Sequence, residues 1–310
     1  MRAVTQQSFG EPDVLTVGEV ARPEPLITEV LVKVRAAGVN PVDAYVRAGA
    51  FPLLGEPPFV LGWDVSGVVE QVGAGVNRFA VGDEVYGMPF FPRAAGGYGE
   101  YVAAPSRHFA RKPKGLDHAQ AAALPLAGLT AWQALVDAAR LQPGQRVLIH
   151  GGAGGVGHLA VQIAKALGAE VYATASAAKH EFVRELGADH LIDYTAGDFA
   201  EGLTDLDAVF DTVGSGTGLR SLPVLRDGGV LATITEHFDE ELAARVTADG
   251  KRYAGVVVEP DHVGLEALTD LVETGRLKPF VEHVLPLEEA AQAHRLIESR
   301  RTKGKIVLAL

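Results

Sequence analysis

The chain contains one run of residues that is rich in glycine, HGGAGGVG at residues 150–157. Its last six residues fit the spacing G-x-G-x-x-G. In that pattern the first glycine permits a tight turn, the second lets a pyrophosphate approach the backbone, and the third lets a helix pack on a strand. Free N–H groups at the start of the following helix attract phosphates. The run therefore indicates a dinucleotide site, and the alternative is a glycine-rich turn without a ligand. The residues assigned to the site are Gly152, Gly154, Gly155, Val156 and Gly157.

The end of the next predicted strand indicates which dinucleotide is bound. An NAD site usually has Asp or Glu about 20 residues past the loop, where it binds the ribose 2′-hydroxyl. Here the end of the strand reads Ala173-Thr174-Ala175-Ser176, with no carboxylate, and Lys179 follows at the start of the next helix. A hydroxyl and an ammonium suit a 2′-phosphate, and one charge-assisted hydrogen bond is worth roughly 1.5–3 kcal/mol. We therefore expect NADPH as the cofactor, and Lys179 as a solvated helix lysine is the alternative.

Strands and helices alternate throughout the segment that carries these residues. Single helices between successive strands predict βαβ units and a parallel sheet. The strands are predicted at residues 146–150, 170–175, 190–194, 207–214, 228–235 and 253–259.

The segments on either side of this region have a different pattern. Residues 1 to about 110 consist of short alternating runs broken by Gly and Pro, which predicts an all-β region in the form of a partly open barrel. Asp117 with Gln120 predicts a capped helix start, and Pro125 and Gly128 are expected to divide the following segment into two helices. After Asp261 we predict a helix, a short strand, a helix at 287–300 and a final strand, KIVLAL, which is expected to return to the first region.

The composition is that of a globular chain. The 310 residues are 47% hydrophobic and 22% charged, with a formal net charge of −11. A phosphate backbone would be repelled by most of such a surface, so nucleic acid is not an expected partner. No apolar run is long enough for a bilayer, and the first residues lack a signal-peptide pattern. We expect a cytoplasmic protein without a membrane partner.

Four segments resemble the zinc-independent, NADPH-dependent quinone oxidoreductases, relatives of zeta-crystallin in the medium-chain dehydrogenase/reductase superfamily. They are AAGVNPVDAYVRAGAF (36–51), GVVEQVGAGVNRFAVGDEVYG (67–87), LPLAGLTAWQAL (124–135) and HGGAGGVGHLAVQIAK (150–165). The resemblance covers essentially the whole chain. It implies an α/β fold class: a GroES-like β-rich catalytic domain (1–118 and 276–310) and a Rossmann domain with a doubly wound parallel sheet (119–275). It also implies an active site in the cleft between the domains.

A metal site is not expected in this chain. The zinc alcohol dehydrogenases of the superfamily use a cysteine and a Gly-His-Glu motif, whereas this chain has no cysteine and reads Gly62-Trp63-Asp64. None of its ten histidines forms an H-x-x-x-H pair. Without a Lewis acid that stabilises an alkoxide, simple alcohol oxidation is disfavoured.

The resemblance also implies catalytic residues in the segment from Asn40 to Tyr45. Asn40 would orient the substrate or the loop with its amide, and Tyr45 would donate a hydrogen bond or a proton. Asp43 would belong to a polar network near the nicotinamide and would not act as a general base. The alternatives are that Asn40 and Asp43 cap the following helix and that Tyr45 only packs.

Further cofactor contacts are implied by the resemblance alone. Thr130 would lie near the nicotinamide, Tyr194 near the adenosine phosphate, and the Asp211–Gly214 turn beside a ribose. Trp63 and the loop 88–99 would line the substrate pocket, or else belong to the core. The residues implied to bind the cofactor are Thr130, Tyr194, Asp211, Val213, Gly214, Thr233 and Arg300.

The expected activity is NADPH-dependent, zinc-free reduction of quinones or α,β-unsaturated carbonyls by hydride transfer. A zinc-free alcohol or enoyl reductase is one alternative, and a non-catalytic NADPH-binding sensor or structural protein is another. The expected partner is a small-molecule quinone or enone substrate. A homodimer through the strand predicted at 253–259 is implied by the resemblance.

Overall fold

The computed structural model describes all residues, 1–310, and their contacts divide the chain into two compact units. The first unit contains residues 1–129, 259–273 and 279–310, and the second contains residues 130–258 and 274–278. These contact-based limits differ from the predicted domain limits at residues 118 and 275. Residues 119–129 and the whole helix after Asp261 (His262–Glu273) belong to the first unit. The domain limits predicted from the sequence (1–118 with 276–310, and 119–275) therefore stay a prediction.

The first unit is built on two β-sheets, a three-stranded one with the order β2-β1-β4 and a seven-stranded one. The larger sheet has the order β15-β16-β3-β5-β6-β8, with β7 paired to β3. Alternate valines of β3, such as Val30, Val32 and Val34, are buried in a core with Val65 and Val85, as the strand period requires. The strands are β1 (Arg2–Gln6), β2 (Thr16–Glu19), β3 (Glu29–Val39), β4 (Phe59–Val60), β5 (Asp64–Val72), β6 (Glu84–Gly87), β7 (Tyr101–Pro105), β8 (Phe109–Arg111), β15 (Val281–Pro286) and β16 (Lys305–Ala309).

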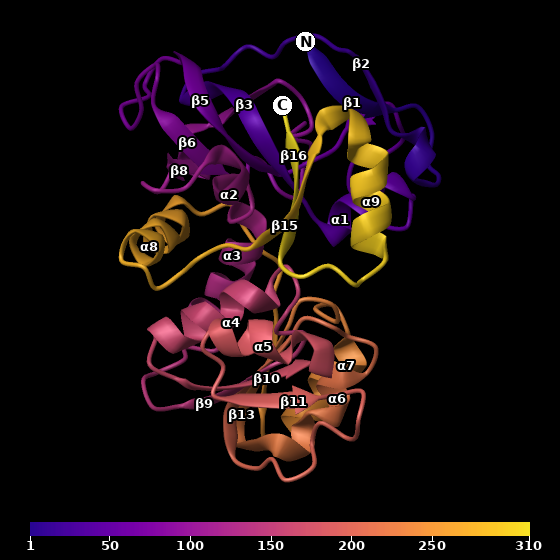
Figure 1. Cartoon of the computed structure of the whole chain (residues 1–310), viewed down its shortest axis with the longest axis vertical. Coiled ribbons are helices and arrows are strands. Elements are labelled where there is room, and N and C mark those ends of the chain that lie inside the picture. Colours follow the sequence, from indigo (N-terminus) through magenta and orange to yellow (C-terminus); the bar gives the residue numbers. More distant parts are fainter. The chain divides into compact units, whose positions relative to one another are not determined.

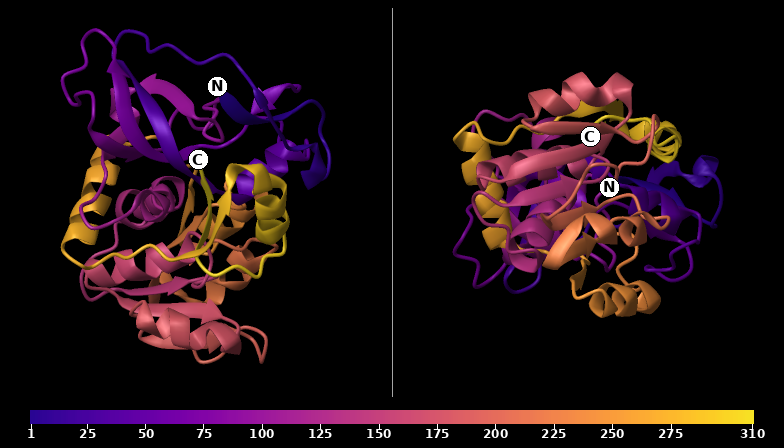
Figure 2. Two further views of the ribbon diagram at one scale, coloured as in Figure 1. Left: turned by 45° about the horizontal axis from the view of Figure 1, so that its top comes forward. Right: turned by 90° about the horizontal axis from the view of Figure 1, so that it is seen from below.

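The last strand returns to the first region, as predicted. Strand β16 pairs antiparallel with β3, with Ile306 opposite Val39 and Ala309 opposite Ala36. Figures 1 and 2 show this yellow strand beside the indigo and purple strands of the first unit. The pairing brings residues more than 260 positions apart in the chain into contact.

The prediction of an all-β region before residue 110 is wrong at α1. Pro41 occupies the first turn of this helix, where its missing N–H is not needed, and Asp43 accepts a hydrogen bond from the backbone N–H of Asn40. The capped start at Asp117 is confirmed, and Pro125 does begin a second helix, but Gly128 lies inside it. The helices are α1 (Pro41–Arg47), α2 (His118–Ala122), α3 (Pro125–Trp132), α8 (His262–Glu273) and α9 (Ala290–Glu298).

The second unit contains the predicted parallel sheet, with the strand order β11-β10-β9-β12-β13-β14. The order reverses between β9 and β12, so the crevice for a ligand is expected at the carboxyl ends of these two strands. The strands are β9 (Arg146–Ile149), β10 (Glu170–Ala175), β11 (His190–Asp193), β12 (Leu206–Asp211), β13 (Leu225–Thr233) and β14 (Arg252–Gly255), and the helices are α4 (Gly157–Ala166), α5 (His180–Glu185), α6 (Thr217–Arg220) and α7 (Glu240–Ala248).

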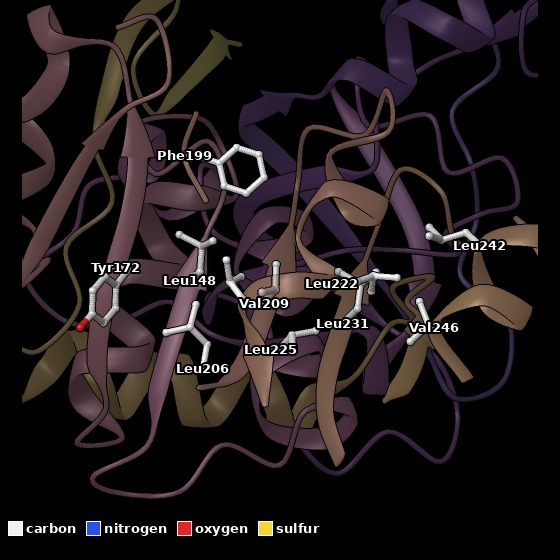
Figure 3. Packing of buried hydrophobic residues seen from close by; sticks show 11 residues of the cluster. Leu148, Tyr172, Phe199, Leu206, Val209, Leu222, Leu225, Leu231, Leu242 and Val246 are labelled. Atoms are coloured by element: carbon white, nitrogen blue, oxygen red, sulfur yellow. The ribbon is translucent and has the colours of Figure 1, made fainter. Parts of the chain in front are cut away.

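One face of this sheet carries a row of apolar side chains. Leu231, Val209, Leu148 and Tyr172 are register partners on four neighbouring strands, and all four belong to one buried cluster. Figure 3 shows the side chains of this cluster, which also contains Phe199. This burial holds the strands in register and so aligns their carboxyl ends.

Strands β12, β13 and β14 end two to four residues earlier than predicted. Strand β12 stops at Asp211 because its carboxylate accepts the backbone N–H groups of Val213 and Gly214, which bends the chain into a turn. Strand β14 stops at Gly255, opposite Thr233, where its partner β13 also ends.

No helix of the chain is both long enough and apolar enough to cross a membrane.

Candidate active site

The glycine run forms the turn between β9 and α4, as the sequence predicts. The left-handed residue of this turn is Gly151 (φ +69°), whereas the spacing assigned the tight turn to Gly152. Gly152 is instead buried, and a Cβ there would lie 3.0 Å from the Ala173 side chain. Gly157 is the first residue of α4, and a Cβ there would lie 2.1 Å from the carbonyl oxygen of Gly151. Gly157 therefore permits the close approach of helix and strand that the pattern requires.

The other members of the glycine run lie at the open side of the turn. Gly154, Gly155 and Val156 are each partly exposed directly before α4. A glycine turn that ends in a helix presents backbone N–H groups, which are suited to the phosphates of a dinucleotide.

Several predicted cofactor residues lie at the same edge of the second unit because parallel strands end on the same side. Thr174 is buried near the end of β10, Tyr194 follows β11 and is 56% exposed, and Thr233 ends β13 fully buried. Ser176 directly follows β10, and Lys179 ends the short 3₁₀ turn after it, partly exposed. The structure thus brings these residues to the carboxyl edge of the parallel sheet.

Asp211 holds the turn after β12 and retains an unused acceptor. Its Oδ1 accepts the N–H groups of Val213 (2.9 Å) and Gly214 (3.1 Å), whereas its Oδ2 is buried without a partner. Burial raises the pKa of this carboxyl above its usual range. A buried acceptor beside the expected crevice fits the hydroxyl groups of a ribose, which donate hydrogen bonds. Val213 is 50% exposed in the same turn.

The two remaining cofactor residues have different surroundings. Thr130 lies in α3 and is 4% exposed. Arg300 is exposed and has a left-handed backbone (φ +56°) between α9 and β16 in the first unit.

In the first unit, Asn40 belongs to a buried cluster of polar side chains. Its Nδ2 donates to Asp64 Oδ2 (2.8 Å), and its Oδ1 accepts a short hydrogen bond from Lys305 Nζ. Lys305 Nζ also lies 3.2 Å from Asp64 Oδ2, and Asp64 Oδ1 accepts the backbone N–H of Leu126 at the start of α3. Both polar ends of the Asn40 amide are therefore engaged within the protein.

Asp43 continues this cluster as the third residue of α1. Its Oδ2 accepts the N–H of Asn40 (2.7 Å) and the hydroxyl of Tyr98 (3.1 Å), and Tyr98 lies 3.4 Å from His294 Nε2. Burial raises the pKa of Asp43 to about 7 and lowers that of His294 to about 3. Asp43 thus makes the contact to the N–H of the cap residue Asn40 that the alternative interpretation described, and its role in catalysis stays a prediction.

The raised pKa of Asp43 predicts a pH-dependent stability. The folded state keeps the Asp43 proton up to a pH of about 7, whereas the unfolded chain releases it near pH 3.9. The stability from this group is therefore complete at acid pH and is lost as the pH rises through 7. We expect Asp43→Asn, which does not titrate, to reduce this loss, so that the variant gains stability relative to the wild type between about pH 5 and about pH 8.

Urea unfolding at the two pH values measures this change. The matched control is Asp239→Asn, another helix-capping aspartate whose carboxylate accepts the N–H of Leu242. If the wild type and Asp43→Asn differ in free energy of unfolding by the same amount at both pH values, the raised pKa of Asp43 is contradicted.

Tyr45 and Trp63 were expected at the substrate side. Tyr45 lies on α1 and is 47% exposed. Trp63 is 1% exposed, its Nε1 donates to the Arg93 carbonyl (2.7 Å), and its ring contacts Phe91 edge-on. Trp63 is thus a core residue that holds part of the loop 88–99.

Sequence reasoning missed the partners in the polar cluster. Lys305 is the first residue of the apolar strand β16 and is 2% exposed, while Asp64 and Tyr98 are fully buried. Arg47 at the end of α1 is also buried and binds Glu298 on α9 through both terminal nitrogens (2.6 and 3.3 Å). For Asp64, Lys305 and Arg47 the signal in the sequence was a charged residue within or beside an apolar run.

Comparison with known proteins identifies the family. The "Alcohol dehydrogenase GroES-like domain" family matches residues 27–114, and the "Zinc-binding dehydrogenase" family matches residues 186–308. The chain is 37% identical to an NADPH-dependent alkenal/one oxidoreductase of Arabidopsis thaliana over 99% of this chain and 79% of that protein.

Two solved structures show the same architecture over the whole chain. A quinone oxidoreductase from Coxiella burnetii superimposes with a TM-score of 0.94 at 36% identity, covering 100% of this chain and 99% of that one. The quinone oxidoreductase of Escherichia coli in complex with NADPH superimposes with a TM-score of 0.89 at 29% identity, covering all of both chains.

The chain therefore belongs to the zinc-independent quinone oxidoreductases of the medium-chain dehydrogenase/reductase superfamily, with a GroES-like part and a Rossmann-type parallel sheet. The predicted fold class is thereby confirmed. The chain contains no cysteine, and it has no group of three or more His, Asp or Glu side chains that could hold a metal ion.

Proposed function

We propose that this chain reduces quinones or α,β-unsaturated carbonyls with NADPH as the cofactor. The observation that carries the proposal is the glycine turn at the point where the strand order of the parallel sheet reverses. The relatives named for quinone and alkenal/one reduction support the substrate class. Bound NADPH supplies a hydride, and a conjugated acceptor can spread the resulting negative charge onto its oxygen.

The residues that hold the cofactor belong to the carboxyl edge of the sheet. Backbone N–H groups from Gly155 to Gly157 bind the pyrophosphate, since the Gly154 N–H is already donated to the Gly151 carbonyl (2.8 Å). Asp211 Oδ2 accepts a ribose hydroxyl. Ser176 and Lys179 bind the 2′-phosphate. The remaining contacts are assigned by family resemblance to Thr130, Thr174, Tyr194, Val213, Gly214, Thr233 and Arg300.

On the substrate side, Tyr45 is a half-exposed residue with a hydroxyl donor. Its hydroxyl holds the oxygen on which charge develops and delivers a proton to the product. Asn40 and Asp43 act through position, because their side chains are engaged in the buried cluster that begins α1. They fix the start of the helix that carries Tyr45.

The testing experiment is NADPH oxidation by the purified protein after treatment with a chelator. A quinone and a short enone are offered in parallel, NADH is the matched control, and the enone product is analysed. We expect turnover with NADPH, and the better acceptor defines the subclass. Tight NADPH binding without turnover of any acceptor in a wider panel would favour the non-catalytic sensor over the reductase.

Lys179 is predicted to decide the preference for NADPH. Asp193 at the end of β11 pairs in register with Ala175, so an acidic group lies beside the proposed 2′-phosphate site. We expect Lys179→Ala to lower the ratio of NADPH to NADH affinity by about tenfold or more, because one charge-assisted hydrogen bond is lost.

The matched variant is Asp193→Asn, which should raise the same ratio by removing the repulsion of the phosphate. The affinities are measured by titration of the nicotinamide fluorescence. A Lys179→Ala protein with an unchanged ratio would show that the 2′-phosphate binds elsewhere.

Tyr45→Phe tests the proposed proton donor. We expect kcat to fall by about a hundredfold, within the range of general acid catalysis, while NADPH affinity stays the same. Steady-state kinetics with a saturating acceptor measure kcat. The control is Phe51→Tyr, which adds one hydroxyl to a nearby ring that is 36% exposed. Full activity of Tyr45→Phe would remove this tyrosine from the mechanism.

Two further features belong to the same proposal. Strand β14 is an outer strand of the parallel sheet, so its free edge can pair with a second copy of the chain to form a homodimer. A cytoplasmic location is also proposed. A zinc-free alcohol or enoyl reductase stays the alternative activity, and the product analysis above distinguishes it.

A further inference from the structure

His150 directly precedes the glycine turn and is not used in the function proposed above. The side chain is 2% exposed, and its ring lies edge-on to Phe199 with centroids 4.6 Å apart. Both ring nitrogens have a hydroxyl partner. Nδ1 lies 3.3 Å from Thr174 Oγ1, and Nε2 lies 2.9 Å from Ser221 Oγ. A buried histidine with two hydroxyl partners is held in one orientation.

The direction of each hydrogen bond follows from the number of available protons. The single hydroxyl proton of Ser221 is donated to the Thr217 carbonyl (2.8 Å), so Ser221 Oγ must accept from His150 Nε2–H. Burial lowers the pKa of His150 to about 3, so the ring is neutral at physiological pH and carries one proton. Nδ1 is therefore bare and accepts the hydroxyl proton of Thr174.

Thr174 then connects the histidine to the glycine turn. Its Oγ1 accepts the backbone N–H of Gly151 (3.0 Å), the residue with the left-handed backbone. The donor of each hydrogen bond in this series is thus assigned. The Gly151 N–H donates to Thr174, the Thr174 hydroxyl donates to His150, the His150 Nε2–H donates to Ser221, and the Ser221 hydroxyl donates to the Thr217 carbonyl. If the ring proton moved to Nδ1, the Thr174 hydroxyl would lose its acceptor.

These five groups span the point where the strand order reverses. Thr174 belongs to β10 and His150 follows β9 on one side, whereas Thr217 and Ser221 lie in and after α6, beyond β12 on the other side. A further hydrogen bond joins the segments after β9 and β12, because Thr212 Oγ1 donates to the carbonyl of His150 (2.7 Å). The glycine turn and the segment after β12 are therefore tied together through one histidine.

On the basis of the NADPH function proposed above, we propose that His150 is a positioning residue for the cofactor. Its Nε2–H tautomer, enforced by Ser221, keeps the Thr174 hydroxyl directed at Nδ1 and so keeps the Gly151 N–H engaged. The glycine turn is thereby held in its binding conformation before NADPH arrives. His150 itself touches neither cofactor nor substrate.

The first test measures the tautomer directly and needs no cofactor. Nitrogen-15 NMR of the histidine side chains in the free protein is expected to show His150 as the neutral Nε2–H tautomer near neutral pH. His150→Gln identifies the signal. A protonated Nδ1 in the wild type would overturn the proposed chain of bonds, whatever the protein binds.

The second test measures NADPH affinity by fluorescence titration. Ser221 is fully buried, so a merely local role of its hydroxyl leaves binding unchanged. We expect Ser221→Ala to weaken NADPH binding by about tenfold and to change the His150 tautomer, because Nε2–H loses its acceptor. The matched control is Ser106→Ala, a buried serine of the first unit, which should bind NADPH like the wild type.

Thr174 gives an independent pair of variants. Thr174→Val removes the hydroxyl and should weaken binding about tenfold, whereas Thr174→Ser restores most of the affinity. In the double variant Thr174→Val/Ser221→Ala the loss should be smaller than the product of the single losses, because Ser221 reaches Gly151 only through His150 and Thr174. Losses that multiply, or a Ser221→Ala protein with wild-type affinity, would overturn the positioning role. A wild type that does not bind NADPH would instead overturn the proposed function and leave the tautomer result intact.

Discussion

Gly157→Ala is expected to weaken NADPH binding by about a hundredfold or more, because the added Cβ meets backbone that cannot turn aside. The Cβ would lie 2.1 Å from the carbonyl oxygen of Gly151 and 3.0 Å from the Cα of Gly152. Helix α4 must then move away from β9, and its first N–H groups move with it. These are the groups proposed to bind the pyrophosphate.

The matched control for Gly157→Ala is Gly197→Ala in the same unit. A Cβ at Gly197 has no neighbouring atom within 4 Å, and its backbone is not left-handed. Fluorescence titration measures the affinity for NADPH, and circular dichroism verifies that each variant is folded. A folded Gly157→Ala protein that binds like the Gly197→Ala protein would contradict the close approach.

Lys305→Met is expected to lower the free energy of unfolding by about 3–5 kcal/mol, the cost of removing one partner from a buried ion pair. Lys305 and Asp64 are 2% and 0% exposed. After the substitution, the Asp64 carboxylate keeps two uncharged donors, Asn40 Nδ2 and the Leu126 N–H, but no cation. An unpaired charge in an apolar interior is strongly unfavourable.

Urea unfolding compares this variant with Arg245→Met, in which the lost ion pair is exposed. Arg245 is 63% exposed and lies 3.6 Å from Asp249, so its removal should change the stability by no more than about 0.5 kcal/mol. The double variant Asp64→Asn/Lys305→Met should recover part of the loss, because no charge is left buried. Equal effects of Lys305→Met and Arg245→Met would mean that the buried pair contributes nothing.

The ion pair also has a consequence for the site. Asp64 accepts hydrogen bonds from Asn40, the cap residue of α1, and from the backbone N–H of Leu126 at the start of α3. Loss of Lys305 is therefore expected to disturb the position of Tyr45 as well as the stability. We expect Lys305→Met to lower kcat for this reason, even at temperatures where the variant is fully folded.

The amino-acid sequence by itself determined the elements of the parallel sheet. Strand β10 has the predicted limits, and β9 and β11 differ from their predictions by one residue, because alternation of apolar residues and the flanking Gly residues are local signals. The glycine spacing likewise predicted the turn before α4, since it depends on neighbours a few positions apart.

Only the tertiary structure decided the chemistry around these elements. Which glycine takes the left-handed backbone depends on Thr174 from the next strand, and the spacing had suggested Gly152 in place of Gly151. The partners of Asn40 come from Asp64 and from Lys305, which is 265 positions away. A local pattern contains no information about such pairs, because they meet only after β16 has paired with β3.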